Sequence, residues 1–272
     1  MIQVRRRQVM VDGKLTLVSG VQGGSVAGRL PRKGKAENTP RPLNFLSSGP
    51  YFAAMFLVTL VALWPSYLSR ILSASNYIHF HALLAALWML MLVAQPMLIR
   101  AKRLAWHRLL GRISYLLAPI FILSIVLLAH SRIKGATGEA FAIQTYILYL
   151  QASLTVLFGL SYVLAITKRH VVALHARFMV CTALTMIDPV VIRILLWIDR
   201  SPGWNYQWLT FGLTDLSLVG LIWLERHGRA GRMVFPGMLA LFVLMQIPAL
   251  FGLTEASAWQ EFARWFAALP LT

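Results

Sequence analysis

The fold class follows from stretches such as residues 108–130, which read RLLGRISYLLAPIFILSIVLLAH. About 20 apolar residues in an α-helix cross the hydrocarbon core of a bilayer. Within lipid every backbone N–H and C=O needs an internal partner, so an apolar stretch of this length folds as a helix. Seven such stretches recur, near residues 51–69, 78–99, 108–130, 142–166, 174–197, 207–225 and 234–252. The sequence therefore predicts an all-α integral membrane bundle of about seven transmembrane helices.

The composition indicates the same environment. Of the 272 residues, 58% are hydrophobic and 13% are charged, whereas a soluble domain carries about 25% charged residues. Lys and Arg number 26 against nine Asp and Glu, for a formal net charge of +17. These cations flank the apolar stretches instead of forming one polar face, so we expect the lipid bilayer as partner and no nucleic acid. The sequence is also compatible with binding to another membrane protein or with a homo-oligomer.

The distribution of Lys and Arg predicts the orientation. Cytoplasmic loops of membrane proteins carry the excess of Lys and Arg. If the amino terminus is cytoplasmic, 20 of the 26 fall on that side. The other side receives six, which are Arg70, Arg132, Lys134, Arg193, Arg200 and Arg264. We therefore expect the amino terminus in the cytoplasm and the carboxyl terminus in the periplasm.

Two terminal segments flank the membrane domain, residues 49–253. Residues 1–48 are basic, rich in Gly, Ser and Pro, and without apolar periodicity, a composition that predicts a disordered cytoplasmic tail. Residues 254–272 predict a short periplasmic amphipathic helix lying in the interface, with Thr254 as its cap and Trp259, Phe262 and Phe266 on one face. Trp204, Tyr206 and Trp208 are typical of an aromatic belt at the same interface.

Histidines at the ends of the spans suggest a cofactor. His107 and His175 open the third and fifth spans beside Arg108 and Arg177. A b-type haem is held by two facing imidazoles, and the two arginines would pair with its propionates. His81 and His130 are weaker candidates at the other face. This pattern predicts a membrane redox protein that binds haem b, unless the imidazoles simply meet lipid headgroups or water.

Three charged residues lie deep inside spans, namely Asp188, Arg193 and Asp215. Each costs about 2.5–3.5 kcal/mol at a helix centre on the insertion scale. Asp188 and Arg193 are five positions apart, or about 140° on a straight helix, so we expect Arg193 to pair with Asp215 on the next span. The second hypothesis is therefore a proton- or ion-coupled transporter with these residues as its relay.

A third hypothesis is a non-catalytic assembly subunit. His81, Trp88 and Gln95 recur every seven residues and so share one helix face. Polar side chains on one face also serve as hydrogen-bonded seams between membrane helices. The sequence contains no Gly-rich phosphate loop and no serine nucleophile elbow. It therefore indicates no particular enzymatic reaction.

The stretch from His81 to Ser114 carries Trp88, Gln95 and the run His107-Arg108-Leu109-Leu110-Gly111-Arg112. A later element combines His175, Arg177 and Met179. With these HRxxG and HxRxM elements, residues 77–197 resemble a group of uncharacterised bacterial multi-pass inner-membrane proteins. The resemblance implies a location in the bacterial inner membrane and no particular activity.

Overall fold

The computed structural model of the protein describes residues 5–11, 14–20, 47–199, 206–228 and 230–272. The predictions made for the tail residues 21–46, and for Arg200 and Trp204, lie outside these described residues. The chain divides into two compact units, Met1–Thr39 and Pro40–Thr272, and each is described by itself.

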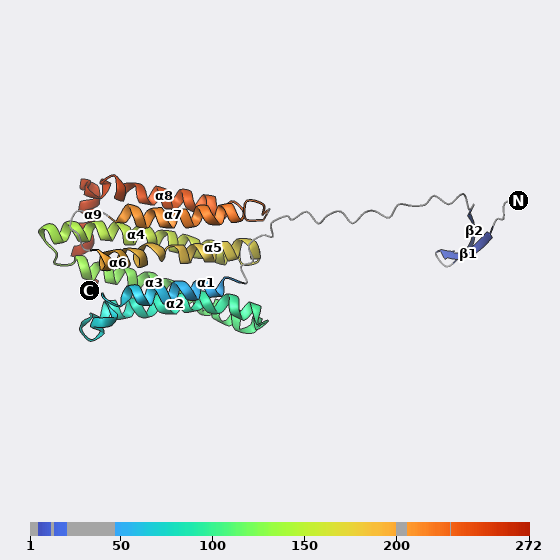
Figure 1. Cartoon of the computed structure of the whole chain (residues 1–272), viewed down its shortest axis with the longest axis horizontal. Helices are drawn as coiled ribbons and strands as arrows, with labels where there is room; N and C mark the ends of the chain where they lie inside the picture. Colours follow the sequence, from blue (N-terminus) through green and yellow to red (C-terminus); the bar gives the residue numbers. More distant parts are fainter. Residues whose placement is uncertain (1–4, 12–13, 21–46, 200–205, 229) are drawn as a thin grey trace. The chain divides into compact units, whose positions relative to one another are not determined.

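The second unit is a bundle of helices that run side by side (Figure 1). Its α-helices are α1 (Gly49–Leu63), α2 (Asn76–Arg100), α3 (Leu104–Ile133), α4 (Gly138–Thr167), α5 (Val172–Leu184), α6 (Ile187–Ile198), α7 (Gln207–Leu224), α8 (Val234–Leu250) and α9 (Ser257–Ala268). Short 3-10 turns, η2 (Leu68–Ser73) and η3 (Leu253–Glu255), join α1 to α2 and α8 to α9. The predicted all-α fold class is confirmed.

Five helical segments are long and apolar enough to cross a membrane: α2, α3, α4, the combined segment Val172–Ile198, and α7. Helices α1 and α8 are also apolar but have 15 and 17 residues, or about 22 and 26 Å at 1.5 Å per residue. All seven predicted spans overlap these helices, although the first was predicted to reach residue 69 and α1 ends at Leu63. The chain is thus a multi-pass membrane protein.

The loops that follow α2, α4 and α7 gather at one end of the bundle, where α1 also begins (Figure 1). We call this the basic end, because its loops and helix ends carry Arg100, Lys102, Arg103, Lys168, Arg169, Arg226 and Arg232. Arg169 reaches across it and donates from Nη1 to the Tyr115 hydroxyl of α3 at 3.1 Å. The loops after α2, α4 and α7 share one end because successive helices of the bundle alternate in direction.

Aromatic packing joins α2, α3 and α4 around Trp88, which is fully buried. Its ring meets Phe158 edge-on at 4.8 Å and Tyr162 edge-on at 5.4 Å between centroids, and it stacks on Phe121 at 6.5 Å. Edge-on and offset rings are the favourable arrangements of aromatic pairs. Trp88, predicted as part of a polar stripe, is therefore the centre of an apolar core.

The fifth span is broken into α5 and α6 at Thr185 and Met186. Pro189 lacks a backbone N–H, and its ring clashes with the carbonyl four residues earlier, which belongs to Thr185. The interruption at Thr185 and Met186 lies just before Pro189 in the chain. As a result Asp188 occupies the first turn of a new helix.

The first unit contains a β-hairpin where the sequence predicted no regular structure. Strand β1 (Arg5–Val11) pairs antiparallel with β2 (Lys14–Gly20), from Arg5 opposite Gly20 to Val11 opposite Lys14. The two strands are separated by the dipeptide Asp12-Gly13, which strongly favours two-residue hairpins. The prediction of a disordered tail was based on composition and did not take this dipeptide into account.

The carboxyl-terminal helix α9 forms as predicted, but its cap and its contacts differ. The helix begins at Ser257 after Ala256, while Thr254 belongs to η3, so the predicted Thr254 cap is wrong. The Trp259 indole donates from Nε1 to the Thr145 carbonyl of α4 at 3.1 Å. Phe266 packs in a cluster with residues of α3 and α4. Ala263 and Phe266 of α9 are thus buried against α3 and α4, while Phe262 on the predicted apolar face is 40% exposed.

Candidate functional site

A buried polar cluster surrounds Asp188 where α6 begins. The Gln207 amide of α7 donates from Nε2 to Asp188 Oδ1 at 2.7 Å, and the Thr210 hydroxyl donates to the same oxygen. Gln207 and Thr210 are themselves hydrogen-bonded at 2.9 Å, and all three side chains are buried. The amino terminus of α6 adds a partial positive charge that favours a carboxylate there.

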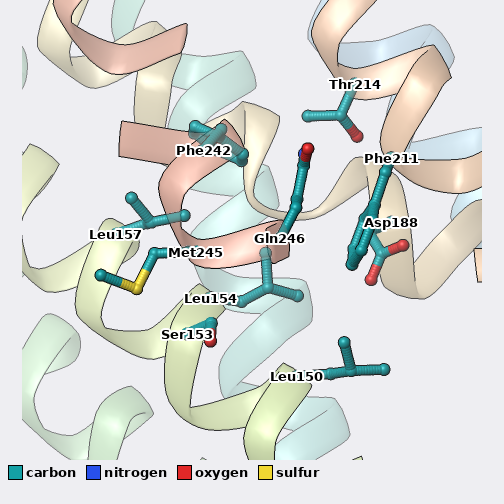
Figure 2. Close-up of a pocket in the computed structure, with 10 residues that line it drawn as sticks. All are labelled: Leu150, Ser153, Leu154, Leu157, Asp188, Phe211, Thr214, Phe242, Met245 and Gln246. Atoms are coloured by element: carbon teal, nitrogen blue, oxygen red, sulfur yellow. The ribbon is translucent and has the colours of Figure 1, made fainter. Parts of the chain in front are cut away.

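Asp188 lines a small cavity between four helices (Figure 2). The polar side chains at this cavity are Ser153 of α4, Asp188 of α6, Thr214 of α7 and Gln246 of α8. Its volume is about 20 Å³, and a single water molecule needs about 10–15 Å³ together with two to four polar partners. The cavity therefore has the volume for one bound water, and six of its ten lining side chains are apolar.

Gln246 links this cavity to Asp215, an acid that is only partly buried. Its amide donates from Nε2 to Asp215 Oδ1 of α7 at 3.0 Å, and the Gln246 side chain also lines the cavity. At 1.5 Å per residue from the basic end, Asp188, Gln246 and Asp215 lie at depths of about 24, 18 and 14 Å. The three side chains therefore form a polar track along the axis of the bundle.

Arg193 belongs to the Asp188 end of this track. Its Nη1 donates to the Pro189 carbonyl one turn earlier in α6. Its charge interacts with the Asp188 carboxylate and with Arg132 of α3. The predicted pairing of Arg193 with Asp215 is wrong, because Arg193 turns to its own half-helix. Asp188 and Arg193 both lie in α6, where their charges interact although the two residues are five positions apart.

His107 and His175 both lie at the basic end, in the first turns of α3 and α5. The two imidazoles interact electrostatically, and His107 also contacts the backbone of Gln95. His175 donates from Nδ1 to the Ala165 carbonyl at 2.9 Å. Among the described residues His107 Nδ1 is buried without a hydrogen-bond partner. Arg108, next to His107, is exposed.

Arg177 forms a buried ion pair that the sequence analysis missed. Its guanidinium donates from Nε to Glu225 Oε2 at 2.6 Å and from Nη2 to Oε1 at 2.8 Å, while Nη1 donates to the Ala173 carbonyl at 2.6 Å. The side chains are 6% and 2% exposed. The arginine assigned to a haem propionate is thus engaged by Glu225, an acid directly after α7 at the same basic end.

At the opposite end His81 and His130 have separate partners. His81 Nδ1 is hydrogen-bonded to the Ser124 hydroxyl at 3.1 Å, and its ring stacks on Phe121. His130 is fully buried, and its Nδ1 is hydrogen-bonded to the Thr272 hydroxyl at 2.7 Å. These contacts tie His81 to the core of α2 and α3, and His130 to the carboxyl-terminal segment.

Comparison with known proteins adds no relative: no family model matches the chain, and no curated protein or solved structure is significantly similar. The resemblance drawn from the HRxxG and HxRxM elements stays a prediction. The function is therefore argued from the geometry of the polar track and of the histidine pair.

Proposed function

We propose that the protein is a proton-coupled membrane transporter whose relay consists of Asp188, Gln246 and Asp215. The supporting observation is a buried carboxyl group at the start of a broken helix, beside a cavity with room for one water. Discontinuous membrane helices place their half-helix ends at ion and substrate sites near the midplane. A buried ionisable residue inside a span is, for the same energetic reason, a functional candidate.

In this proposal a proton moves between the two carboxyl groups. The proton leaves one Asp and protonates the other by way of the cavity water beside Asp188 and the Gln246 side chain, which lines the cavity and bonds Asp215, so that one carboxyl group is neutral at each stage. Gln246 lines the cavity and acts as a positioning residue for Asp215, to which it is hydrogen-bonded. Arg193 stabilises ionised Asp188 through its charge, and Gln207 and Thr210 do so through hydrogen bonds.

The test is proton flux across liposomes containing the purified full chain. We expect Asp188→Asn to abolish the flux, because an amide fills the same space but cannot carry the proton. The matched control is Asp199→Asn at the exposed end of α6, which removes an acid outside the track. Unchanged flux in a correctly folded Asp188→Asn variant would contradict the proposal.

We further propose that the chain lies in the bacterial inner membrane with its amino terminus in the cytoplasm. The excess of Lys and Arg on that side supports this orientation. A carboxyl-terminal reporter that is active only in the periplasm is expected to be active. Activity of a cytosolic reporter at that terminus instead would reverse the orientation.

A b-type haem redox protein is the second candidate, supported by the His107 and His175 pair. A ligating histidine commonly donates its other ring N–H to a carbonyl, as His175 does to Ala165. The test is the visible spectrum of the detergent-purified protein. A Soret band and a sharp reduced α-band that vanish in His107→Ala and His175→Ala would support haem, whereas a colourless protein would exclude it.

The same experiments also test the hypothesis of a non-catalytic assembly subunit. It is retained if the protein is colourless and if neither Asp188→Asn nor Asp215→Asn changes proton flux or the cellular phenotype. In that case the polar contacts described above act only as seams between helices.

A further inference from the structure

A surface rich in arginine lies at the basic end, on α3 and on the turn that follows α4. Arg108, Arg112 and Tyr115 are four and three residues apart on α3, so they lie within about 60° of one another around the helix. Arg169, just after the end of α4, donates from Nη1 to the Tyr115 hydroxyl at 3.1 Å. All four side chains are exposed. We call these four residues the arginine surface.

The contact between α3 and α4 fixes the position of this surface. Ser114, the residue before Tyr115, is hydrogen-bonded to the Tyr162 hydroxyl of α4 at 3.0 Å, and both side chains are buried. Tyr115 therefore lies at the edge of a closed helix contact, and it holds Arg169 toward α3. Confining a long side chain costs conformational entropy, and a contact that is made before a ligand arrives reduces the cost of binding that ligand.

The length of α3 brings the arginine surface to the level of lipid headgroups. The helix has 30 residues, or about 45 Å at 1.5 Å per residue, whereas the hydrocarbon core is about 30 Å thick. Arg108 and Arg112 follow Leu104, the first residue of α3, by about 6 and 12 Å along the helix. Helical side chains point toward the amino terminus of their helix, and long cationic side chains extend to the aqueous interface. These lengths place both guanidinium groups in the headgroup layer.

The acids of the bundle do not balance this positive charge. Within the described loops and helix ends of the basic end, Glu225 is the only acid, and its two carboxylate oxygens are bonded to Arg177. In the part of the chain that the structure describes, no Asp or Glu forms an ion pair with Arg108, Arg112 or Arg169. Exposed charges of one sign repel one another and attract an ion of the opposite sign from outside the chain.

Toward the middle of the bundle the same side of α3 and α4 is apolar. Pro119 follows Tyr115 by four residues on α3 and is exposed. On α4, Gly159 faces α3, because a Cβ there would lie 3.6 Å from Ile122 Cδ1. Val163, four residues closer to the basic end, is 55% exposed. Cations at headgroup depth above an apolar face complement a molecule that has an anionic headgroup and apolar chains.

We propose that the arginine surface binds an anionic phospholipid. The phosphate would accept hydrogen bonds from the guanidinium groups of Arg112 and Arg169. Tyr115, which accepts from Arg169, would donate its own hydroxyl proton to a phosphate oxygen. Arg108 would contact the outer part of the headgroup, and the acyl chains would lie along the apolar side of α3 and α4. Basic pockets between membrane helices are typical sites for phospholipid headgroups. This site is separate from the polar track and does not depend on the proposed transport.

The experiment titrates the purified full chain in detergent with phosphatidylglycerol and measures the bound lipid by native mass spectrometry. We expect the wild type to bind phosphatidylglycerol in preference to phosphatidylcholine with the same acyl chains. Arg112→Gln and Arg169→Gln are each expected to weaken this binding by about tenfold, because a charge-assisted contact is lost. Tyr115→Phe, which removes only a hydroxyl, is expected to weaken it by about fivefold. The matched control is Arg226→Gln, which removes an exposed arginine of the basic end outside the arginine surface and is expected to have little effect.

Equal weakening by Arg112→Gln and Arg226→Gln, with no effect of Tyr115→Phe, would overturn the proposal, because binding would then follow only the total charge of the basic end. Equal binding of the two lipids would also overturn it. Glycerol phosphate carries the anionic group without acyl chains, and we expect it not to displace phosphatidylglycerol at equal concentration. Displacement would show a site for soluble anions and refute the assignment to lipid. The Tm of each variant, measured by circular dichroism, verifies that a loss of binding is not a loss of folding.

Discussion

Removal of the Glu225 carboxylate is expected to destabilise the bundle strongly, because Glu225 is the buried counter-charge of Arg177. The ion pair joins α5 to the end of α7 through two parallel hydrogen bonds of 2.6 and 2.8 Å. Such bidentate contacts between guanidinium and carboxylate are among the strongest side-chain interactions in proteins. The substitution Glu225→Ala tests whether this pair holds the basic end together.

The expected magnitude follows from two opposing terms. At 2.6 Å between Arg177 Nε and Glu225 Oε2, the attraction is about 6 kcal/mol for an effective dielectric constant near 20. Removing both charges from water costs several kcal/mol for each ion, so the net contribution of the pair is small. Removing one partner alone costs about 3–5 kcal/mol, because the other charge stays buried. Glu225→Ala is therefore expected in that range.

The assay is thermal unfolding of the purified variants in detergent, followed by circular dichroism. A loss of about 4 kcal/mol corresponds to a decrease in Tm on the order of 10 °C. The matched control is Glu261→Ala on an exposed position of α9, with little expected change. Replacement of both partners, Arg177→Met with Glu225→Leu, is expected to restore most of the lost stability. A Tm for Glu225→Ala equal to that of the control would refute the reasoning.

Three further substitutions test the packing. Gly231 has a positive φ of 75°, and an added Cβ would lie 3.1 Å from Arg177 Nη1. Gly231→Ala is therefore expected to lower the stability by about 1–2 kcal/mol for the backbone alone. A Tm unchanged from wild type would contradict this. Trp88→Ala is expected to lower the stability by about 3–5 kcal/mol, because it empties the aromatic core. The control is Trp64→Ala at a 59% exposed position. Equal Tm values for the two variants would disprove the assignment of Trp88 to the core. Phe266→Ala is expected to release α9 from the bundle and so to increase cleavage of α9 by protease. The control is Phe251→Ala at a 73% exposed position. Equal cleavage of the two variants would show that Phe266 does not anchor α9.

The membrane fold was predictable because it depends on one local quantity, the length of each apolar stretch. A run of about 20 apolar residues leaves the backbone no alternative to a helix in lipid. Pro189 in the fifth span is another local feature, because it removes a backbone donor wherever it lies. The hairpin in residues 5–20 was missed although its Asp12-Gly13 dipeptide is also a local signal.

The site was predictable only in part. Asp188, Arg193 and Asp215 stand out in the sequence, because charges in apolar stretches are costly. Their partners do not stand out: Gln207, Thr210 and Gln246 are ordinary polar residues in the sequence, and they acquire a role only where α6, α7 and α8 meet. In the same way His107 and His175 were visible as a pair, while the engagement of Arg177 by Glu225 was not.

The sequence by itself determined the solvent, the helices and the residues that carry charge into the membrane. Only the tertiary structure decided which of these residues face one another. The physical reason is that a helix forms from its own residues, whereas a contact between helices depends on the rotation and depth of each. Both are set by side-chain packing among all the helices at once. Arg193 shows this dependence most directly, because in the folded chain it bonds the Pro189 carbonyl of its own helix α6 and not its predicted partner Asp215.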